Sequence, residues 1–365
     1  MRPHIIQVIP SPTGGGAEFL VRELGQGISS EDFTSEVIFF NSNVKLKKII
    51  QYSENESNLG VGSRNLIAIF KLRSIFKKRM LKYDKVLIHA HLTWAFYFVS
   101  LASLFLDVKL VYTEHNTTNK RRNIPPLKYV EKYIYGRYTR LICISHGVKE
   151  SLEKWVGDKL SSRIVVVQNG ARLYKLKYRS PLKKSSKLQL VSVGSLTKKK
   201  GFNTAIQAVS ELREYIGNYQ IIGEGPCRGN LERLIAELKL QNKIHLIGWS
   251  NDLEIYFHEA DIQLIPSMWE GFGLVAVEGM STGLPVVASN VDGLREVLNP
   301  NNLGVFLVNN RENPKNWVDA IQKCILRIQD DRFVIENAVR SQAEQFSRKR
   351  MIDEYREIYK EIFEL

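Results

Sequence analysis

Two glutamates are the residues of this chain best suited to bind a sugar. Glu270 and Glu278 lie eight positions apart in the run W-E-G-F-G-L-V-A-V-E-G. Carboxylates accept hydrogen bonds from sugar hydroxyls. The glycines between them, Gly271 and Gly273, free backbone N–H groups to meet a phosphate at the start of a helix. The run therefore combines the features that a nucleotide-sugar site requires.

The pattern around this run places both glutamates at one edge of a sheet. The apolar residues 261–266 predict a buried strand, and residues 274–282 predict the helix that follows it. Glu270 then lies on the loop between them, and Glu278 lies one turn into the helix. Open α/β sheets bind ligands beyond the carboxyl ends of their strands, so we expect both side chains to face such a cleft.

A lysine before a glycine marks a second strand-to-helix loop. Residues 188–193 predict a strand, and the loop after it runs to Lys200 and Gly201. Because Gly201 begins the next helix, Lys200 is expected to place its ammonium near the cleft, where it can neutralise a diphosphate leaving group without a metal ion. A lysine run is usually a solvated face, which is our interpretation of Lys198 and Lys199.

The first predicted strand, residues 5–9, is followed by three glycines at 14–16. Glycines before a helix let backbone N–H groups approach a phosphate, which makes Gly15 and Gly16 candidates for such a contact. Their spacing does not match the G-x-G-x-x-G dinucleotide fingerprint. A plain tight turn is an equally good interpretation of this segment.

Three histidines end predicted strands. His115 follows a strand and stands beside polar residues, which favours a role in a site over a place in the core. His89 and His91 end another strand, but their apolar neighbours make a structural role equally good. No Asp-x-Asp follows an apolar strand, and no cluster of His, Cys and carboxylates has ligand spacing. We therefore predict no catalytic metal and no cofactor.

The basic residues are unevenly distributed. Residues 1–187 hold 32 Lys and Arg against 14 Asp and Glu, whereas the remaining residues hold 20 against 24. Such an asymmetry indicates an anionic partner for the first half. Two basic amphipathic segments, 64–82 and 120–140, account for much of it and could lie on an anionic membrane face. Their candidate cations are Arg73, Lys77, Lys78, Lys120, Arg121 and Arg122.

The alternative for these segments is that their apolar residues are core and their cations are merely solvated. Nucleic acid is not expected as a partner, because no base-reading motif accompanies the charge. The three cysteines lie far apart, which fits a reducing cytoplasm. The longest uncharged stretch, residues 92–106, is shorter than the ~20 residues of a spanning helix. We expect a cytoplasmic protein, peripheral on the inner face of the cell membrane.

Strand and helix signals alternate along the 365 residues, as in βα units with a parallel sheet. We predict an N-terminal domain at 1–170, a linker at 171–187 and a second domain at 188–345. A terminal amphipathic helix at 346–365 could cross back to the first domain. The expected strands are 5–9, 37–40, 86–89, 110–113, 141–144 and 164–167, then 188–193, 220–222, 244–246, 262–265 and 285–288.

In this order the motifs resemble those of the family 4 glycosyltransferases, which are retaining enzymes of the GT-B fold that use nucleotide sugars. The resemblance covers nearly the whole length, and its one specific motif is the run from Glu270 to Glu278. The others are weak singly: Gly14 to Glu18, Glu114-His115-Asn116, Ser145-His146-Gly147, Gln168-Asn169-Gly170, Gly194-Ser195-Leu196, Lys200-Gly201 and Gly223-Glu224-Gly225.

The resemblance implies an α/β fold of two Rossmann-like parallel-sheet domains that face a deep inter-domain cleft. It implies that Glu270 binds donor-sugar hydroxyls, that Glu278 binds the ribose and that His115 lies against the donor sugar. Ser195 stands where many members carry Arg, so diphosphate binding would rest more on Lys200. The remaining implied donor contacts are Gly15, Gly16, Gly271, Phe272, Gly273 and Leu274.

From the resemblance we expect sugar transfer, with retention, from a nucleotide-diphosphate donor to an acceptor hydroxyl. The basic first half indicates a lipid-linked glycan acceptor, as in bacterial surface polysaccharide assembly. Two alternatives stay open: a non-catalytic nucleotide-sugar or lipid-binding protein of this fold, and a nucleotide-dependent oxidoreductase. The latter lacks its fingerprint after the first strand. A sugar phosphorylase or an epimerase is also compatible with the fold.

Overall fold

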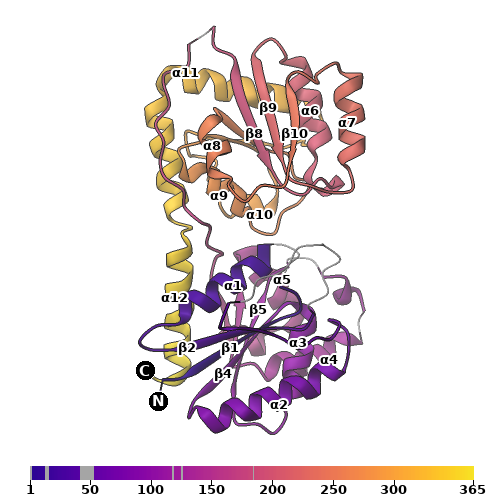
Figure 1. Ribbon diagram of the computed structural model, residues 1–365, viewed down its shortest axis with the longest axis vertical. Coiled ribbons are helices and arrows are strands. Elements are labelled where there is room, and N and C mark those ends of the chain that lie inside the picture. The colour runs from indigo at the N-terminus through magenta and orange to yellow at the C-terminus, as the bar shows by residue number, and fades with distance from the viewer. Residues whose placement is uncertain (1, 13–15, 42–52, 117–118, 125, 184) are drawn as a thin grey trace. The chain divides into compact units, whose positions relative to one another are not determined.

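The computed structural model describes residues 2–12, 16–41, 53–116, 119–124, 126–183 and 185–365. Contacts between residues divide the chain into two compact units. Unit 1 comprises Met1–Gly170 and Lys349–Leu365, and unit 2 comprises Ala171–Arg348. Each unit is an α/β fold built on one parallel sheet (Figure 1). The predicted alternation of strands and helices is thus confirmed.

Unit 1 holds a seven-stranded sheet in the order β3-β2-β1-β4-β5-β6-β7. Every pair of neighbours is parallel, so helices must cover both faces and the strands are apolar almost throughout. The strands are β1 His4–Ile9, β2 Thr34–Phe39, β3 Glu56–Asn58, β4 Val86–His91, β5 Lys109–Glu114, β6 Arg140–Cys143 and β7 Ile164–Val166.

Some helices of unit 1 begin and end at recognisable signals. At α5, for example, the Ser145 hydroxyl accepts a hydrogen bond from the Val148 N–H at 3.2 Å, and Gly157 ends the helix at φ +78°. The helices are α1 Gly16–Ile28, α2 Ile67–Lys82, α3 Leu92–Ala102, α4 Leu127–Gly136, α5 His146–Val156 and α12 Arg348–Phe363, with 3-10 turns η1 Lys120–Asn123 and η2 Asp158–Arg163.

The C-terminal helix α12 packs on the sheet of unit 1, as predicted (Figure 1). Its buried residues follow the helical period and include Tyr355, Tyr359 and Phe363. The Tyr359 ring stands edge-on to Phe33 with centroids 6.2 Å apart. The Lys85 ammonium donates to the Phe363 carbonyl at 3.0 Å. This helix therefore completes one face of the unit 1 core.

Unit 2 repeats the architecture with a six-stranded parallel sheet in the order β10-β9-β8-β11-β12-β13. The strands are β8 Leu188–Val193, β9 Ile216–Ile222, β10 Ile244–Gly248, β11 Ile262–Ile265, β12 Val286–Ser289 and β13 Val305–Val308. The helices are α6 Phe202–Glu211, α7 Arg228–Glu237, α8 Glu254–Glu259, α9 Leu274–Ser281, α10 Asp292–Arg295 and α11 Pro314–Glu344, with a 3-10 turn η3 Lys198–Lys200.

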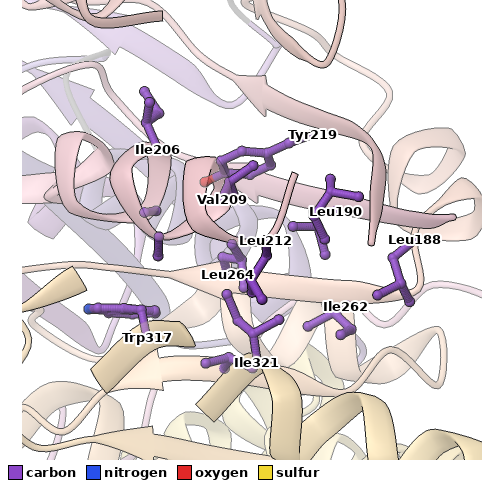
Figure 2. Close-up of a cluster of buried hydrophobic side chains, with 14 of the residues drawn as sticks. Leu188, Leu190, Ile206, Val209, Leu212, Tyr219, Ile262, Leu264, Trp317 and Ile321 are labelled. Atoms are coloured by element: carbon purple, nitrogen blue, oxygen red, sulfur yellow. The ribbon is translucent and has the colours of Figure 1, made fainter. Parts of the chain in front are cut away.

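Alternate strand residues of unit 2 enter two different cores. Leu190 and Ile221 join the cluster that Trp317 of α11 completes, whereas Val191 and Ile222 pack with Phe257 of α8 on the opposite face. Figure 2 shows the larger cluster, with side chains from the sheet, α6 and α11 converging. Burial of an aliphatic side chain stabilises the fold by about 1.5–3 kcal/mol. The two cores fix the sheet whose loops carry the candidate site.

Residues 171–187, which we expected to be a linker, belong to unit 2 and pack on it. Tyr174 is buried beside Phe257. The Arg179 guanidinium donates to the carbonyls of Phe257 and Ala260, both at 2.7 Å, and pairs with the Glu336 carboxylate. Weak apolar periodicity indicated a linker, but polar side chains that bond to backbone carbonyls hold this segment in place.

The sequence analysis did not predict two of the strands, β3 and β13. β3 holds only Glu, Ser and Asn, and its one neighbour in the sheet, β2, supplies the pairing that its composition does not predict. β13 is four residues long and pairs with β12 at the other sheet's edge. Among the described residues, no helix combines the length and apolarity needed to cross a bilayer.

Candidate functional site

The candidate site of unit 2 lies where the strand order of its sheet reverses. β8 and β11 are neighbours in the sheet, and their connections leave in opposite directions along it. The loop after β8 leads to Lys200, and the loop after β11 carries Glu270. In open α/β sheets this switch point is where ligands bind. The predicted lysine and the predicted glutamate thus come from the two strands that flank it.

The loop after β8 is pressed against the loop after β11. Gly201 adopts the left-handed conformation at φ +62°, and a Cβ there would lie 2.0 Å from the Pro266 carbonyl oxygen. The Met268 N–H donates to the Lys199 carbonyl at 2.7 Å. Only glycine meets both demands at position 201. The contact explains why a glycine must follow Lys200, and it holds that lysine against the second loop.

Lys200 and Glu270 form an ion pair between their ammonium and carboxylate groups. Both side chains are largely buried, with exposed fractions of 16% and 10%. The Ser267 hydroxyl donates a second hydrogen bond to the Glu270 carboxylate at 2.8 Å. These two contacts fix the orientation of the Glu270 carboxylate. The two residues that were predicted to bind diphosphate and sugar are therefore in direct contact.

Glycines shape the start of α9 next to this pair. Gly273 caps the helix at φ +86°, and Leu274 is its first residue. A Cβ on Gly293 would lie 2.2 Å from the Glu270 carbonyl oxygen, so α10 approaches the Glu270 loop closely. The first N–H groups of a helix have no intrahelical acceptor and carry partial positive charge. The predicted segment from Gly271 through Phe272 to Leu274 thus forms an anion-accepting helix start.

Glu278 lies one turn into α9, as predicted, in a different electrostatic setting. Burial raises the pKa of the Glu278 carboxyl to about 7, although the guanidinium groups of Arg348 and Arg172 act to lower that pKa. A carboxyl with a pKa near neutrality holds its proton for part of the time and can then donate as well as accept a hydrogen bond. This property suits a group that binds a pair of ribose hydroxyls.

The loop after β8 also contacts the loop after β9. Ser195 is exposed in the loop after β8, and the Leu196 N–H donates to the Glu224 carbonyl at 2.9 Å. A Cβ on Gly223 would lie 2.0 Å from the Gly194 carbonyl oxygen, and one on Gly225 would lie 2.5 Å from the Leu196 carbonyl oxygen. The segment Gly223-Glu224-Gly225 is therefore a turn at which two backbones are in close contact.

Lys199 corrects one expectation. We interpreted it as a solvated cation, but its ammonium lies 3.3 Å from the centroid of the Trp269 ring, and burial lowers its pKa. Trp269 itself is 55% exposed. An ammonium over an indole face is a cation–π contact. Sequence reasoning missed this pair because its two members lie 70 positions apart.

In unit 1 the same kind of switch point lies between β1 and β4. Gly16 begins α1, whereas Gly15 lies outside the described residues. His115 follows β5 and is 9% exposed; its Nε2 lies 3.3 Å from Nδ1 of His91, which ends β4. Burial lowers the pKa of His115 to about 4. His115 is therefore a neutral imidazole at neutral pH.

Three of the candidate membrane cations have other roles. The Arg73 guanidinium donates to the carbonyls of Ala102 and Leu104 at 3.0 and 2.6 Å, so it caps the end of α3. Arg121 is buried and pairs with Glu114 and Glu131 at 3.1 and 3.2 Å. Their assignment to a membrane face was wrong, because an amphipathic pattern does not distinguish a solvated guanidinium from one that satisfies buried acceptors.

Arg122 is also withdrawn from solvent. Its side chain is 10% exposed and bonds to the Glu114 carboxylate at 3.2 Å and to the Ser151 hydroxyl at 2.6 Å. Lys77 and Lys78 are exposed on α2, in keeping with a surface role. The side chain of Lys120 lies outside the described part of the chain. Within that described part, no group of three or more His, Cys, Asp or Glu side chains is arranged to hold a metal ion.

Both units match known protein families. Residues 175–340 match the family described as "Glycosyl transferases group 1", and residues 14–173 match "Glycosyltransferase Family 4". Together the two matches span nearly the whole chain. Their boundary falls close to the division between unit 1 and unit 2.

Individual relatives carry matching descriptions. The Escherichia coli UDP-Gal:alpha-D-GlcNAc-diphosphoundecaprenol alpha-1,3-galactosyltransferase is 27% identical over 289 residues, which are 74% of this chain and 71% of that protein. The amylovoran biosynthesis glycosyltransferase AmsK of Erwinia amylovora is 34% identical over 165 residues, 42% of this chain and 39% of that protein. The Anabaena protein HepE, solved with UDP and glucose, superposes with a TM-score of 0.77 at 18% identity and covers 98% of this chain and 99% of its own.

Proposed function

Because this chain belongs to the family 4 glycosyltransferases of the GT-B fold, we propose that it transfers a sugar, with retention, from a nucleotide-diphosphate donor to a lipid-linked glycan. The observation that carries the donor assignment is the Lys200–Glu270 pair at the switch point of unit 2. This pair supports the proposal because it combines a cation and a carboxylate on the loops next to the start of α9, where an anion is favoured.

The proposed chemistry needs no protein nucleophile. The acceptor oxygen bonds to the anomeric carbon on the face from which the diphosphate leaves, the bond from that carbon to the phosphate oxygen breaks, and the acceptor proton passes to the departing phosphate. Lys200 and the first turn of α9 stabilise the growing negative charge. Glu270 holds sugar hydroxyls and Glu278 holds the ribose. Because Lys200 supplies the cation, we propose that the reaction proceeds without a metal ion.

The acceptor proposal rests on the relatives and on surface charge. One relative's description names a diphosphoundecaprenol acceptor, and another's names the synthesis of amylovoran. We infer the same class here, a lipid-linked glycan of a surface polysaccharide. Tyr129 and Tyr133 of α4 are 78% and 71% exposed, and Lys77 and Lys78 are exposed on α2. Such aromatic and basic residues favour the interface of an anionic bilayer.

The donor is tested with the purified full chain and a panel of nucleoside diphosphates and their sugars. A donor at a free concentration one hundred times its dissociation constant stabilises the folded chain by about 2.7 kcal/mol. The matching nucleotide is therefore expected to raise the melting temperature. Incubation with lipid-linked acceptors then yields a product whose mass grows by one sugar and whose new linkage keeps the donor's anomeric configuration by NMR. No melting shift with any member, or an inverted linkage, contradicts the proposal.

Metal independence and the rival functions are decided in the same assay. Transfer unchanged by EDTA supports the role given to Lys200, and transfer restored only by Mg²⁺ or Mn²⁺ contradicts it. A non-catalytic binder shifts its melting temperature with a nucleotide sugar but forms no product. An oxidoreductase is stabilised by a nicotinamide nucleotide instead.

Membrane association is tested by sedimentation with vesicles. Replacing Lys77 and Lys78 by Glu is expected to weaken binding to anionic vesicles, since each basic residue near the surface contributes about 1 kcal/mol. The matched control replaces Lys323 and Arg327, two exposed cations on α11, by Glu and changes the net charge equally. Equal loss of binding in both double variants contradicts a membrane face on α2.

A further inference from the structure

A continuous path of buried polar groups leads away from His115 through unit 1. Nε2 of His115 lies 3.3 Å from Nδ1 of His91, and Nε2 of His91 lies 2.8 Å from Oε1 of Gln7. Nε2 of Gln7 lies 3.1 Å from the Tyr359 hydroxyl of α12. His91, Gln7 and Tyr359 are at most 1% exposed, so each bond is shielded from water.

The direction of each hydrogen bond along this path follows from the last bond, which joins Gln7 to Tyr359. The amide of Gln7 donates to Tyr359, so its oxygen is left to accept from His91. His91 must then carry its proton on Nε2, and its Nδ1 has a lone pair. That lone pair accepts from Nε2 of His115. The ring of His115 is thereby protonated on Nε2, and its Nδ1 is left as an acceptor.

A second branch fixes the hydroxyl at the far end. The Tyr359 hydroxyl lies 2.6 Å from Nδ1 of His89, and Nε2 of His89 lies 2.7 Å from the Thr113 hydroxyl. Because Tyr359 accepts from Gln7, its own proton is available to His89. The Tyr355 hydroxyl lies 3.3 Å from that of Thr113. Two tyrosines of the C-terminal helix therefore anchor both branches.

All three imidazoles are neutral, as this pattern requires. Burial lowers the pKa of His89, His91 and His115 below the ordinary value. The groups that face them from β1, β5 and α12 are the uncharged Gln7, Thr113, Tyr355 and Tyr359. Among the residues that the structure describes, no carboxylate bonds to any of the three rings, so the path orders protons without adding a charge.

We propose that His91 and Gln7, held by Tyr359 of the C-terminal helix, are positioning residues that lock His115 as its Nε2–H tautomer. The locked ring presents Nδ1 as a fixed acceptor for a substrate hydroxyl. This role rests on the proposed function, in which His115 contacts a sugar. In this proposal α12 has a role besides packing, because Tyr359 determines which nitrogen of His115, 244 positions earlier in the chain, carries the proton.

The tautomer is tested directly in the full chain by long-range ¹H–¹⁵N correlation spectra with ¹⁵N-labelled histidine, assigned by single His→Gln variants. The expected result is that His91 and His115 are both neutral at pH 7 with the proton on Nε2. A proton on Nδ1 of His115, or rapid exchange between its two tautomers, overturns the proposal. The measurement needs no substrate, so its outcome does not depend on whether the proposed function is correct.

Two substitutions at position 91 separate positioning from packing. In His91→Asn the amide oxygen takes the place of Nδ1 and can still accept from His115. In His91→Gln the amide nitrogen takes the place of Nε2 and bonds to Gln7, but the acceptor for His115 is lost. We expect His91→Gln to lower kcat about tenfold, the worth of one hydrogen bond, and to release the His115 tautomer, whereas His91→Asn retains most of kcat.

His4 provides the matched control. It is a buried histidine of the same sheet that bonds to Thr34 and Glu36, away from the path. His4→Gln is expected to lower the melting temperature without changing kcat or the His115 spectrum. Equal kcat in both position-91 variants, with His115 still on Nε2–H, would show that packing alone explains His91. Absence of transfer by the wild-type chain would reject the proposed function, while the wild-type spectrum would still decide the tautomer.

Discussion

The two units place their chemistry at corresponding points of the same topology but build it differently. In unit 2 the candidate residues lie on two loops, and glycines let those loops touch: Gly201 against Pro266 and Gly293 against Glu270. In unit 1 polar side chains from β1, β4 and β5, from the residue that follows β5 and from α12 form one buried path. One unit binds with backbone and paired charges, whereas the other orients neutral groups.

This difference predicts opposite sensitivities. The unit 2 site tolerates few changes of backbone shape, because main-chain atoms are in contact. The unit 1 path tolerates few changes of hydrogen-bonding pattern, because each buried donor has one acceptor and an unmet one is costly. The variants below are chosen to break or sharpen this contrast.

Arg121→Leu is expected to have the largest effect on stability. The change removes the guanidinium that pairs with both buried carboxylates, so that Glu131 loses its guanidinium partner and Glu114 retains only Arg122, and removing one partner of a buried pair costs about 3–5 kcal/mol. Urea unfolding at neutral pH measures the loss. Lys132→Leu, a nearby change of equal charge, is the comparison. If Arg121 served as a solvated membrane cation instead, both variants would unfold at the wild-type midpoint.

Gly201→Ala is expected to cost less, about 1–3 kcal/mol from the left-handed backbone alone, with added loss from the clash at Pro266. Its particular signature is weaker nucleotide binding, because the Lys200 loop must move. Gly229→Ala in α7 is the control: a Cβ there meets no atom within 4 Å, so the free energy of unfolding stays the same or rises. Unchanged nucleotide affinity in Gly201→Ala would contradict the role of the loop contact.

A third prediction is a pH dependence of stability that has opposite sign in the two units. Burial lowers the pKa of His115 to about 4, so the unfolded chain binds the extra proton first, and unit 1 loses stability as pH falls from about 6.5 toward 4. Burial raises the pKa of Glu278 to about 7, so unit 2 loses stability as pH rises from about 4.5 toward 7.

Hydrogen exchange of peptides from each unit across this pH range measures the two trends separately, after correction for the intrinsic exchange rate. Glu278→Gln should flatten the trend in unit 2 and leave that of unit 1 unchanged. A trend in unit 2 that survives the substitution would assign the pH dependence to another group.

The residues of the unit 2 site could be predicted from the sequence, whereas the hydrogen-bonded path of unit 1 could not, and the reason is physical. Glu270, Gly273 and Glu278 are close in the chain, so their spacing alone places them on one loop and one helix. Gln7 and Tyr359 are separated by 352 positions and meet only because α12 returns to the first sheet. A polar residue inside an apolar strand was the available signal: Gln7 and His89 are buried midway along β1 and β4.

Charge patterns were the least reliable guide. Arg73, Lys77 and Lys78 share one amphipathic helix, yet Arg73 caps α3 while the two lysines are exposed. An arginine side chain is long enough to reach the end of a neighbouring helix, where its guanidinium donates hydrogen bonds to backbone carbonyls. No sequence pattern identifies those carbonyls in advance. The segment 171–187 was misjudged in the same way, because Arg179 binds it to unit 2 through backbone oxygens.

The central claim is that Lys200 and Glu270 together form the donor site. Its most direct test is sugar transfer by Lys200→Ala and Glu270→Ala, with Lys198→Ala, an exposed cation two positions away, as the control. We predict that kcat/KM falls by about a hundredfold or more in both site variants, with circular dichroism that shows an intact fold, while Lys198→Ala stays fully active. Full activity in either site variant would contradict the claim.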